Sequence, residues 1–237
     1  KTSLVKLLCR FYDPSAGRIT VDGVDLRDMD LDGWRERTGA AFQDFVHFQL
    51  VASEAVGVGD LPAIDDLERV GASARQAGAD RVIDRLPGGL STQLGRWFEG
   101  GVDLSEGEWQ RVALARGLMR PAPALLVLDE PTASLDPRAE HEVFATFASM
   151  ARTGSDEGPI TILVSHRFST VRMADMIIVL HDGQIEEVGS HDELLAANGR
   201  YRQLYDKQYK IEKDRFVNPG EDFTPEPEKP EPYLQST

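Results

Sequence analysis

The first 210 residues alternate between two patterns of apolar positions. Apolar residues at helical spacing recur over residues 2–11, 63–86, 105–119 and 138–151. Between these stretches stand short apolar runs typical of buried strands, at residues 38–42, 125–129 and 160–164. Strands that alternate with helices form βαβ units, so the pattern predicts an α/β fold with a mainly parallel sheet.

The stretch from about residue 50 to 120 has a pattern of its own, with helical spacing and little strand signal. We therefore expect an α-helical subdomain inserted into the sheet. Within it, residues 63–86 place apolar side chains on one face at a single helical period. That face consists of Leu67, Val70, Ala74 and Ala77.

Two further segments carry the pattern of β-hairpins. Residues 18–26 turn at Asp22-Gly23, and residues 176–188 turn at Asp182-Gly183. An Asp-Gly pair favours a tight hairpin turn, because both central positions of that turn need a positive φ. After the second hairpin, Ser190 and Glu193 stand in the spacing of a capping box, which predicts a helix start there.

Composition narrows the class of protein. With 237 residues, 41% of them hydrophobic, the chain can bury a core in one or two domains. A net charge of −14 disfavours non-specific binding of phosphate backbones, so we expect no nucleic-acid partner. No apolar run reaches the ~20 residues of a membrane helix. The single cysteine, Cys9, cannot form an internal disulfide. Residues 212–237 are rich in Pro and Glu, and we expect them to form a disordered tail.

The chain opens on Lys1-Thr2-Ser3, directly before an amphipathic helix. A phosphate-binding loop ends in this way: its lysine contacts the β- and γ-phosphates, and the hydroxyl that follows holds Mg²⁺. Taken alone, the triplet is more simply a solvated lysine at a helix N-terminus. If the loop interpretation is right, its glycines lie upstream of Lys1, and we expect the sequence to be a fragment.

A pair of carboxylates follows the most apolar strand. Leu125 to Leu128 form the strand, and Asp129 and Glu130 stand at its C-terminal end, where parallel sheets bind ligands. Asp129 suits a Mg²⁺ ligand, and Glu130 suits a base that activates the attacking water. The alternative is a strand that simply ends in an acidic turn.

These motifs, with others in the same order, resemble the nucleotide-binding domain of ABC transporters over residues 1–211. Lys1-Thr2 resembles the end of the Walker A loop, and Leu125 to Glu130 resembles the Walker B strand. The other matches are Phe42-Gln43-Asp44 (Q-loop), Leu104 to Arg111 (signature motif), Ser134-Leu135-Asp136 (D-loop) and Val164-Ser165-His166 (switch histidine). The resemblance implies a P-loop NTPase sheet that lacks its N-terminal strands and carries the inserted helical subdomain.

The resemblance also implies ATP and Mg²⁺ as bound groups. It assigns the nucleotide phosphates to Lys1, Thr2 and Ser3. It assigns Mg²⁺ to Thr2, Gln43 and Asp129, and the catalytic set to Glu130, His166 and Gln43.

Other residues of the same types compete for these roles. Gln49 lies beyond the strand that Gln43 follows, and we expect it to be a loop residue. The remaining histidines are expected to be structural or solvated: His47, His141, His181 and His191.

A second nucleotide-binding domain is the implied partner, because in this family the signature motif of one domain meets the ATP held by the other. The residues implied in this contact are Ser105, Gly107 and Asp136. This chain has Glu106 where the family has glycine, and a carboxylate near a γ-phosphate adds like-charge repulsion. We interpret Glu106 as the mark of an asymmetric heterodimer, with a low-activity homodimer as the alternative. Glu108, where many members have glutamine, is a common variant.

The C-terminal part resembles exporter cassettes, over residues 174–195 and 199–204. This resemblance implies a transmembrane domain, expected upstream in the same polypeptide, and a location at the cytoplasmic face of a membrane. Trp97 and Phe98, before the signature motif, are either contacts for membrane helices or packing residues, and packing is slightly favoured.

Three other kinds of protein compete with a fused exporter. A soluble ABC ATPase of the DNA-repair kind carries a coiled coil or zinc insertion before the signature motif, and the sequence shows no heptad run or cysteine pair there. A regulatory domain that only senses ATP has no need of Glu130. A free-standing ATP-binding subunit is the third alternative.

Overall fold

The computed structural model describes residues 1–132, 140, 143, 144, 147 and 160–216. The chain divides into two compact units, Lys1–Ala174 and Asp175–Thr237, and each is described by itself. Asp136 of the D-loop, most of the helix expected over 138–151 and residues 217–237 of the expected tail lie outside the described residues. The assignment of residues 1–211 to one functional domain stays a prediction.

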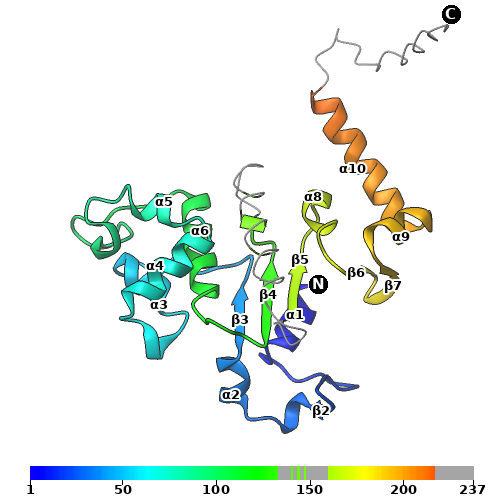
Figure 1. Ribbon diagram of the computed structural model, residues 1–237, viewed down its shortest axis with the longest axis horizontal. Helices are drawn as coiled ribbons and strands as arrows, with labels where there is room; N and C mark the ends of the chain where they lie inside the picture. Colours follow the sequence, from blue (N-terminus) through cyan, green and yellow to red (C-terminus); the bar gives the residue numbers. More distant parts are fainter. Residues whose placement is uncertain (133–139, 141–142, 145–146, 148–159, 217–237) are drawn as a thin grey trace, which may run out of the picture. The chain divides into compact units, whose positions relative to one another are not determined.

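A three-stranded parallel sheet forms the centre of the first unit (Figure 1). Its strands are β3 (Thr38–Ala41), β4 (Leu125–Asp129) and β5 (Ile160–Val164), in the order β3-β4-β5. The register places Ala41 beside Leu128, and Asp129 beside Val164. The structure therefore confirms the three strands and the parallel sheet that the sequence predicts, with the C-terminal ends of all three at one edge.

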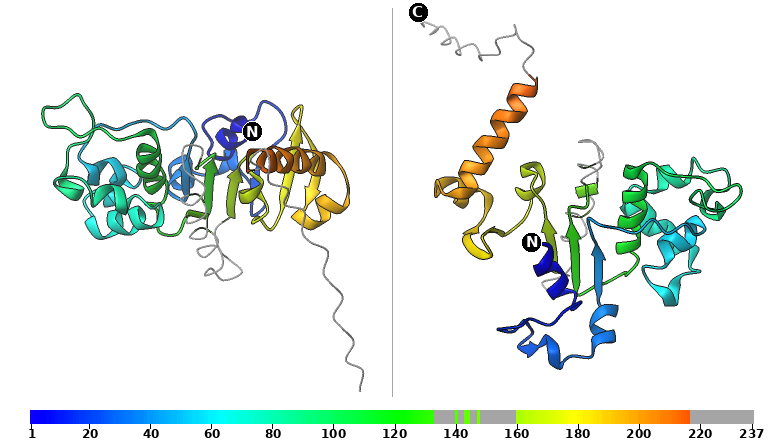
Figure 2. Two further views of the ribbon diagram at one scale, coloured as in Figure 1. Left: turned by 90° about the horizontal axis from the view of Figure 1, so that it is seen from above. Right: turned by 180° about the vertical axis from the view of Figure 1, so that it is seen from behind.

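The central strand is buried on both of its faces, which explains its unbroken apolar run. Leu125 and Val127 pack with Val5 on one face, where α1 (Thr2–Leu8) lies. Figure 2 shows α1 over this face of the sheet. Leu126 and Leu128 point the other way and join the core of the helical region. The alternation follows from the two-residue period of a strand.

Residues 50–120, all of which the structure describes, are mainly helical, as the sequence predicts. Their elements are α3 (Ala52–Gly57), the 3₁₀ turn η2 (Leu61–Ala63), α4 (Leu67–Gln76), α5 (Asp80–Ile83), the 3₁₀ turn η3 (Gly89–Ser91) and α6 (Glu106–Gly117). In Figure 1 these helices lie beside β3.

Residues 63–86 are helical in part, as expected, but they do not form one continuous helix with the expected buried face. Gly78 has a φ of +66° and ends α4, with the amide of Ala79 donating to the carbonyl of Ala74 in the manner of a Schellman cap. Leu67 is not on the buried face either: it is the first residue of α4 and is 57% exposed, whereas Ala74 is buried. The apolar pattern of the sequence continues past Gly78, but the helical backbone ends there.

Helix α6 approaches β3 more closely than side chains would allow. A Cβ on Gly117 would lie 2.7 Å from the carbonyl oxygen of Ala40, and one on Gly39 would lie 2.8 Å from the carbonyl oxygen of Gly117. Two glycines therefore let the backbones of the helix and the strand meet directly.

We expect Gly117→Ala to lower the free energy of unfolding by about 1–3 kcal/mol, because a backbone oxygen cannot move away as a flexible side chain can. This loss outweighs the gain of roughly 1 kcal/mol that alanine brings to a helix. Gly71→Ala in α4 is the matched control: its Cβ would meet only the tip of the Arg75 side chain, at 3.4 Å, and the substitution should stabilise the chain. Equilibrium unfolding in urea compares the two. Equal stabilities of Gly117→Ala and the wild type would contradict the close contact.

The start of the chain reaches β3 through a hairpin and two short helical segments. These are β1 (Thr20–Val21), β2 (Val24–Asp25), the 3₁₀ turn η1 (Leu26–Asp28) and α2 (Leu31–Glu36). Asp22 and Gly23 both have a positive φ, as the Asp-Gly turn predicts. The indole N–H of Trp34 in α2 donates to the carbonyl of Leu8, which ties α2 to the end of α1.

The second unit begins with the other expected hairpin, β6 (Ile177–His181) and β7 (Gln184–Gly189), which turns at Asp182-Gly183. Ser190 and Glu193 form the expected capping box at the start of α9 (His191–Ala196). Helix α10 (Arg200–Phe216) runs five residues into the segment expected to be disordered from residue 212. Residues 212–216 contain neither Pro nor Gly, and the first such breaker is Pro219. Among the described residues, no helix is both long and apolar enough to span a membrane.

Candidate functional site

The candidate site lies where the three parallel strands end, beside the N-terminus of α1. Asp129 is the last residue of β4, and the hydroxyl of Thr2 at the start of α1 lies near enough to its carboxylate to oppose the rise in its pKa. Glu130 follows on the same strand. His166 follows β5, and its Nδ1 lies 3.2 Å from Oε1 of Glu130. The structure thus brings four predicted site residues together from three separate segments of the chain.

Asp129 is an under-satisfied buried carboxylate. It is 1% exposed, and its Oδ2 has no hydrogen-bond partner among the described residues. Burial raises the pKa of Asp129, the nearby hydroxyl of Thr2 lowers it, and the negative charges of Glu130 and Asp44 raise it further. A buried oxygen atom without a partner, in a negative field and beside a hydroxyl, fits a hard divalent cation such as Mg²⁺.

The same geometry makes Asp129 costly for stability. The pKa of Asp129 is raised in the folded chain, so folding disfavours its charged form. This loss of stability is present above the raised pKa. It disappears as the pH falls and the carboxyl is protonated. Asp129→Asn should therefore raise the free energy of unfolding by about 1–3 kcal/mol at neutral pH, without added cation. The gain should vanish at acid pH. Urea unfolding at several pH values measures both, and an unchanged or lower stability at neutral pH would contradict the cost.

Glu130 has an unusual backbone conformation. Its φ is +50°, in the left-handed region that costs a non-glycine residue roughly 1–3 kcal/mol. Two hydrogen bonds hold the backbone of this residue. The N–H of Glu130 donates to the carbonyl of Val164 at 2.9 Å, and the carbonyl of Glu130 accepts from Nε2 of Gln110 at 3.2 Å. The backbone of Glu130 is therefore fixed from β5 on one side and from α6 on the other.

The residues that follow His166 are anchored by a buried acid. Glu140 is 5% exposed, forms an ion pair with Arg167 and accepts a hydrogen bond from the hydroxyl of Thr170 at 2.6 Å. Thr170 lies in α8 (Phe168–Val171). His166 itself is exposed, so the position of its ring depends on this neighbouring anchor and on Glu130.

The sequence alone singled out neither Gln110 nor Glu140. The only signal was a polar residue inside a predicted helix, and nothing in the pattern distinguishes a buried polar residue from a solvated one. Gln110 stands among Trp109, Val112 and Ala113 in a run that is otherwise apolar and buried, apart from Arg111.

The other residues predicted to bind the phosphates and the metal at this end of the sheet, Lys1, Ser3 and Gln43, are exposed. Lys1 is the N-cap residue of α1, Ser3 lies in its first turn, and Gln43 follows β3 by two residues. Gln49 lies in a loop, as expected, where its Oε1 accepts a hydrogen bond from the backbone of Trp97 at 3.0 Å. Trp97 is 84% exposed, so the slight preference for a packing role of this side chain is wrong.

The predicted signature motif begins α6. Ser105 is the N-cap residue, and both its backbone N–H and its hydroxyl donate to Oε2 of Glu108, at 2.9 Å each. The backbone bond from Ser105 is the largest influence on Glu108 and lowers the pKa of its carboxyl, with burial opposing it and Arg85 assisting. Glu108, where the family often has glutamine, thus closes a capping box.

Glu106 projects from the first turn of α6 and is not isolated. Its carboxylate lies 3.5 Å from Nε2 of His47, and the His47 ring stacks on Trp109 with centroids 4.8 Å apart. His47, which was expected to be structural or solvated, thus makes structural contacts that link the segment after Gln43 to the signature helix. Among the described residues, no hydrogen bond or ion pair joins Ser105 or Glu106 to Asp129.

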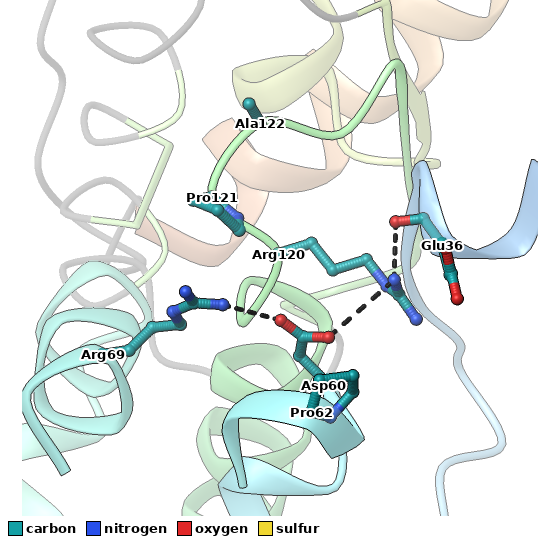
Figure 3. Close-up of a pocket in the computed structure, with 7 residues that line it drawn as sticks. All are labelled: Glu36, Asp60, Pro62, Arg69, Arg120, Pro121 and Ala122. Atoms are coloured by element: carbon teal, nitrogen blue, oxygen red, sulfur yellow. Dashed lines mark hydrogen bonds and ion pairs between the residues drawn. The ribbon is translucent and has the colours of Figure 1, made fainter. Parts of the chain in front are cut away.

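A pocket of about 330 Å³ lies near the opposite ends of the strands (Figure 3). Glu36 and Arg120, which line it, precede β3 and β4 respectively. Its charged side chains bind one another: Asp60 pairs with Arg69 at 2.7 Å, and Arg120 donates to the carbonyl of Glu36 at 2.5 Å and faces Asp60 at 4.0 Å. This cluster joins the helical region to the sheet. Because its charged side chains already bind one another, the strand-end site is the better candidate for the functional site.

Parallel strands that end in a carboxylate pair and a histidine, beside a helix that starts with Lys-Thr, define the class of P-loop ATPases. The chain belongs to the ABC transporter family: the family profile described as ABC transporter matches residues 1–133. The expected P-loop ABC ATPase fold is therefore confirmed, and membership of the family brings ATP binding with it.

Relatives and a solved structure agree with this family. The chain is 40% identical over 219 residues to "ABC transporter ATM1" of Toxoplasma gondii, covering 92% of this chain and 18% of that protein. It is 41% identical over 209 residues to an ATP-dependent lipid A-core flippase of Burkholderia orbicola, covering 88% of this chain and 33% of that protein. A bacterial Atm1-family ABC exporter with ATP bound matches with a TM-score of 0.78 and 38% identity, over 88% of this chain and 34% of that chain.

The chain thus spans between about a fifth and a third of the length of these relatives. Each is named as a transporter, a flippase or an exporter, which favours a transporter over the DNA-repair alternative.

Proposed function

We propose that this chain is the ATP-hydrolysing part of a membrane exporter, in which ATP binding closes two nucleotide-binding domains and the closure moves attached membrane segments. The observation that carries the proposal is the group at the strand ends, where Glu130 contacts His166 and the hydroxyl of Thr2 acts on the neighbouring carboxylate of Asp129. The exporters and flippases among its relatives support the same conclusion.

In the proposed site, each residue has a chemical role. Lys1, Thr2 and Ser3 bind the phosphates, with the N-terminus of α1 directed at them. Thr2, Asp129 and Gln43 are the ligands for Mg²⁺, which when bound would neutralise phosphate charge. The unsatisfied Oδ2 of Asp129 supports this assignment.

Glu130 is the proposed general base. Its carboxylate accepts a proton from the water that attacks the γ-phosphate. His166 keeps that carboxylate in place through the contact at Nδ1, and its exposed ring leaves Nε2 to face a phosphate oxygen. Lys1 and His166 together stabilise negative charge in the transition state.

The proposed partner is a second nucleotide-binding domain. Ser105 and Gly107 at the start of α6, with Asp136, would meet the ATP held by that partner, and the helix start offers N–H groups and a positive dipole end. Glu106 opposes such a contact with its charge, and the pairing with His47 offsets this only in part, because both side chains are exposed. We therefore favour a heterodimer whose two ATP sites differ.

The exposed Trp97 fits a contact with the membrane-embedded part, and the proposed location is the cytoplasmic face of a membrane.

The experiment uses the full-length protein that carries this chain, purified in lipid nanodiscs without other subunits. If Glu106 weakens the contact between the signature motif and ATP, Glu106→Gly should raise the rate of Mg²⁺-dependent ATP hydrolysis several-fold. Glu68→Gly is the control, because Glu68 is an exposed acid in the first turn of α4 and outside the site. Rapid hydrolysis by the unmodified protein that Glu106→Gly leaves unchanged would contradict the asymmetry. Absence of hydrolysis with any partner would contradict the ATPase proposal itself.

A further inference from the structure

Gln110 stands out as a buried amide in the helix that carries the signature motif. It is 4% exposed, and its neighbours Trp109 and Val112 are buried apolar residues. Its Nε2 donates to the carbonyl of Glu130 at 3.2 Å, across 20 positions of sequence. A buried polar group in an apolar setting is costly unless it is hydrogen-bonded, so an apolar residue would be the simpler solution for packing alone.

The bond from Gln110 meets the backbone at its most constrained point. Glu130 has a left-handed φ of +50°, and such a conformation persists only when the surroundings hold it. The N–H of Glu130 is held by Val164, so without Gln110 the carbonyl side of the same residue would lose this restraint. The direction of the Glu130 side chain, and hence its 3.2 Å contact with His166, follows from this backbone.

Gln110 also connects this backbone to the start of α6. Glu106 and Gln110 are four residues apart and share a face of the helix. The end of α6 that is proposed to meet the partner's ATP therefore lies one helical turn from the bond that holds the chain's own Glu130.

We propose that Gln110 is a positioning residue for ATP hydrolysis, which acts by holding the Glu130 backbone so that its carboxylate faces His166. The inference rests on the proposed function, because it assumes that Glu130 acts on water. Gln110 takes no part in binding ATP, so its loss should change the rate of the chemical step and leave nucleotide affinity unchanged.

The test compares Gln110→Met with a matched control in the full-length protein. Methionine keeps the length of the side chain and removes the donor. Ser73→Ala is the control: Ser73 is buried, and its hydroxyl donates to the carbonyl of Leu118 just beyond the other end of α6, at 3.3 Å. Gln110→Met should lower kcat on the order of tenfold to a hundredfold with KM for ATP unchanged, and Ser73→Ala should leave kcat unchanged. Equal kcat values for Gln110→Met and the wild type would overturn the proposal.

A double variant separates positioning from a general structural role. If Gln110 acts through Glu130, adding Gln110→Met to Glu130→Gln should cause no further loss of the residual hydrolysis. A further tenfold loss in that background would show that Gln110 acts independently of Glu130, which contradicts the proposal.

Hydrogen exchange gives a readout that needs no catalysis. The amide of Glu130 should exchange faster in Gln110→Met than in Ser73→Ala, and equal exchange in the two variants would contradict the restraint. If the wild type fails to hydrolyse ATP with any partner, the proposed function is wrong, and the exchange result alone then decides whether Gln110 holds the Glu130 backbone.

Discussion

Glu130→Gln is expected to reduce ATP turnover to a small residual rate and to stabilise the ATP-bound dimer. Glutamine keeps the shape of the side chain and its contact distance to His166, but it cannot accept a proton from the attacking water. General-base catalysis contributes roughly 10²–10⁴-fold, so the steady-state rate should fall by at least a hundredfold. Phosphate release by the full-length protein measures the loss, and gel filtration with ATP measures the accumulation of the dimer.

The control for this prediction separates the loss of a base from the loss of a charge. Asp44→Asn also removes a negative charge that acts on Asp129, but it leaves the Glu130 carboxylate in place. It should keep most of the hydrolytic activity. Unchanged hydrolysis in Glu130→Gln would remove Glu130 from the mechanism, and equal losses in both variants would point to charge as the cause.

Glu140→Ala is expected to lower the free energy of unfolding by about 3 kcal/mol. The substitution leaves Arg167 without its carboxylate partner and the fully buried hydroxyl of Thr170 without its acceptor. Breaking a buried ion pair by removing one partner typically costs about 3–5 kcal/mol, and the partial exposure of Arg167 places this case at the lower end. Chemical denaturation followed by tryptophan fluorescence measures the loss.

Glu140→Gln is the graded comparison. The amide oxygen still accepts from Thr170, but the charge that pairs with Arg167 is gone, so the loss should be about 1–2 kcal/mol. Because Arg167 follows His166 directly, both variants should also reduce ATP hydrolysis. A loss of stability below about 1 kcal/mol in Glu140→Ala would show that the buried cluster is replaceable.

The strands, both hairpins and the strand-end site were predictable because local patterns determine them. Four apolar residues followed by Asp129-Glu130 describe a buried strand and its functional end at once. The Asp-Gly pairs likewise specify their own turns. Each of these features depends on residues that are neighbours in the sequence.

The features that the sequence did not reveal depend on residues that are distant in it. Whether Gly78 would end a helix depended on its φ, which the apolar period does not encode. Gln110 and Glu140 hold residues 20 and 27 positions away, at Glu130 and Arg167. A single polar residue in a helix has no local signal that tells such a role from solvation.

The contact between α6 and β3 has a mechanical consequence. Where Gly39 and Gly117 meet, backbone touches backbone, and no side chain from either of these residues is interlocked with the other element. Packed cores usually resist small rotations because interdigitated side chains must change rotamer together. At this point the distance between α6 and β3 is therefore set by backbone contact and does not depend on a choice of side-chain rotamers.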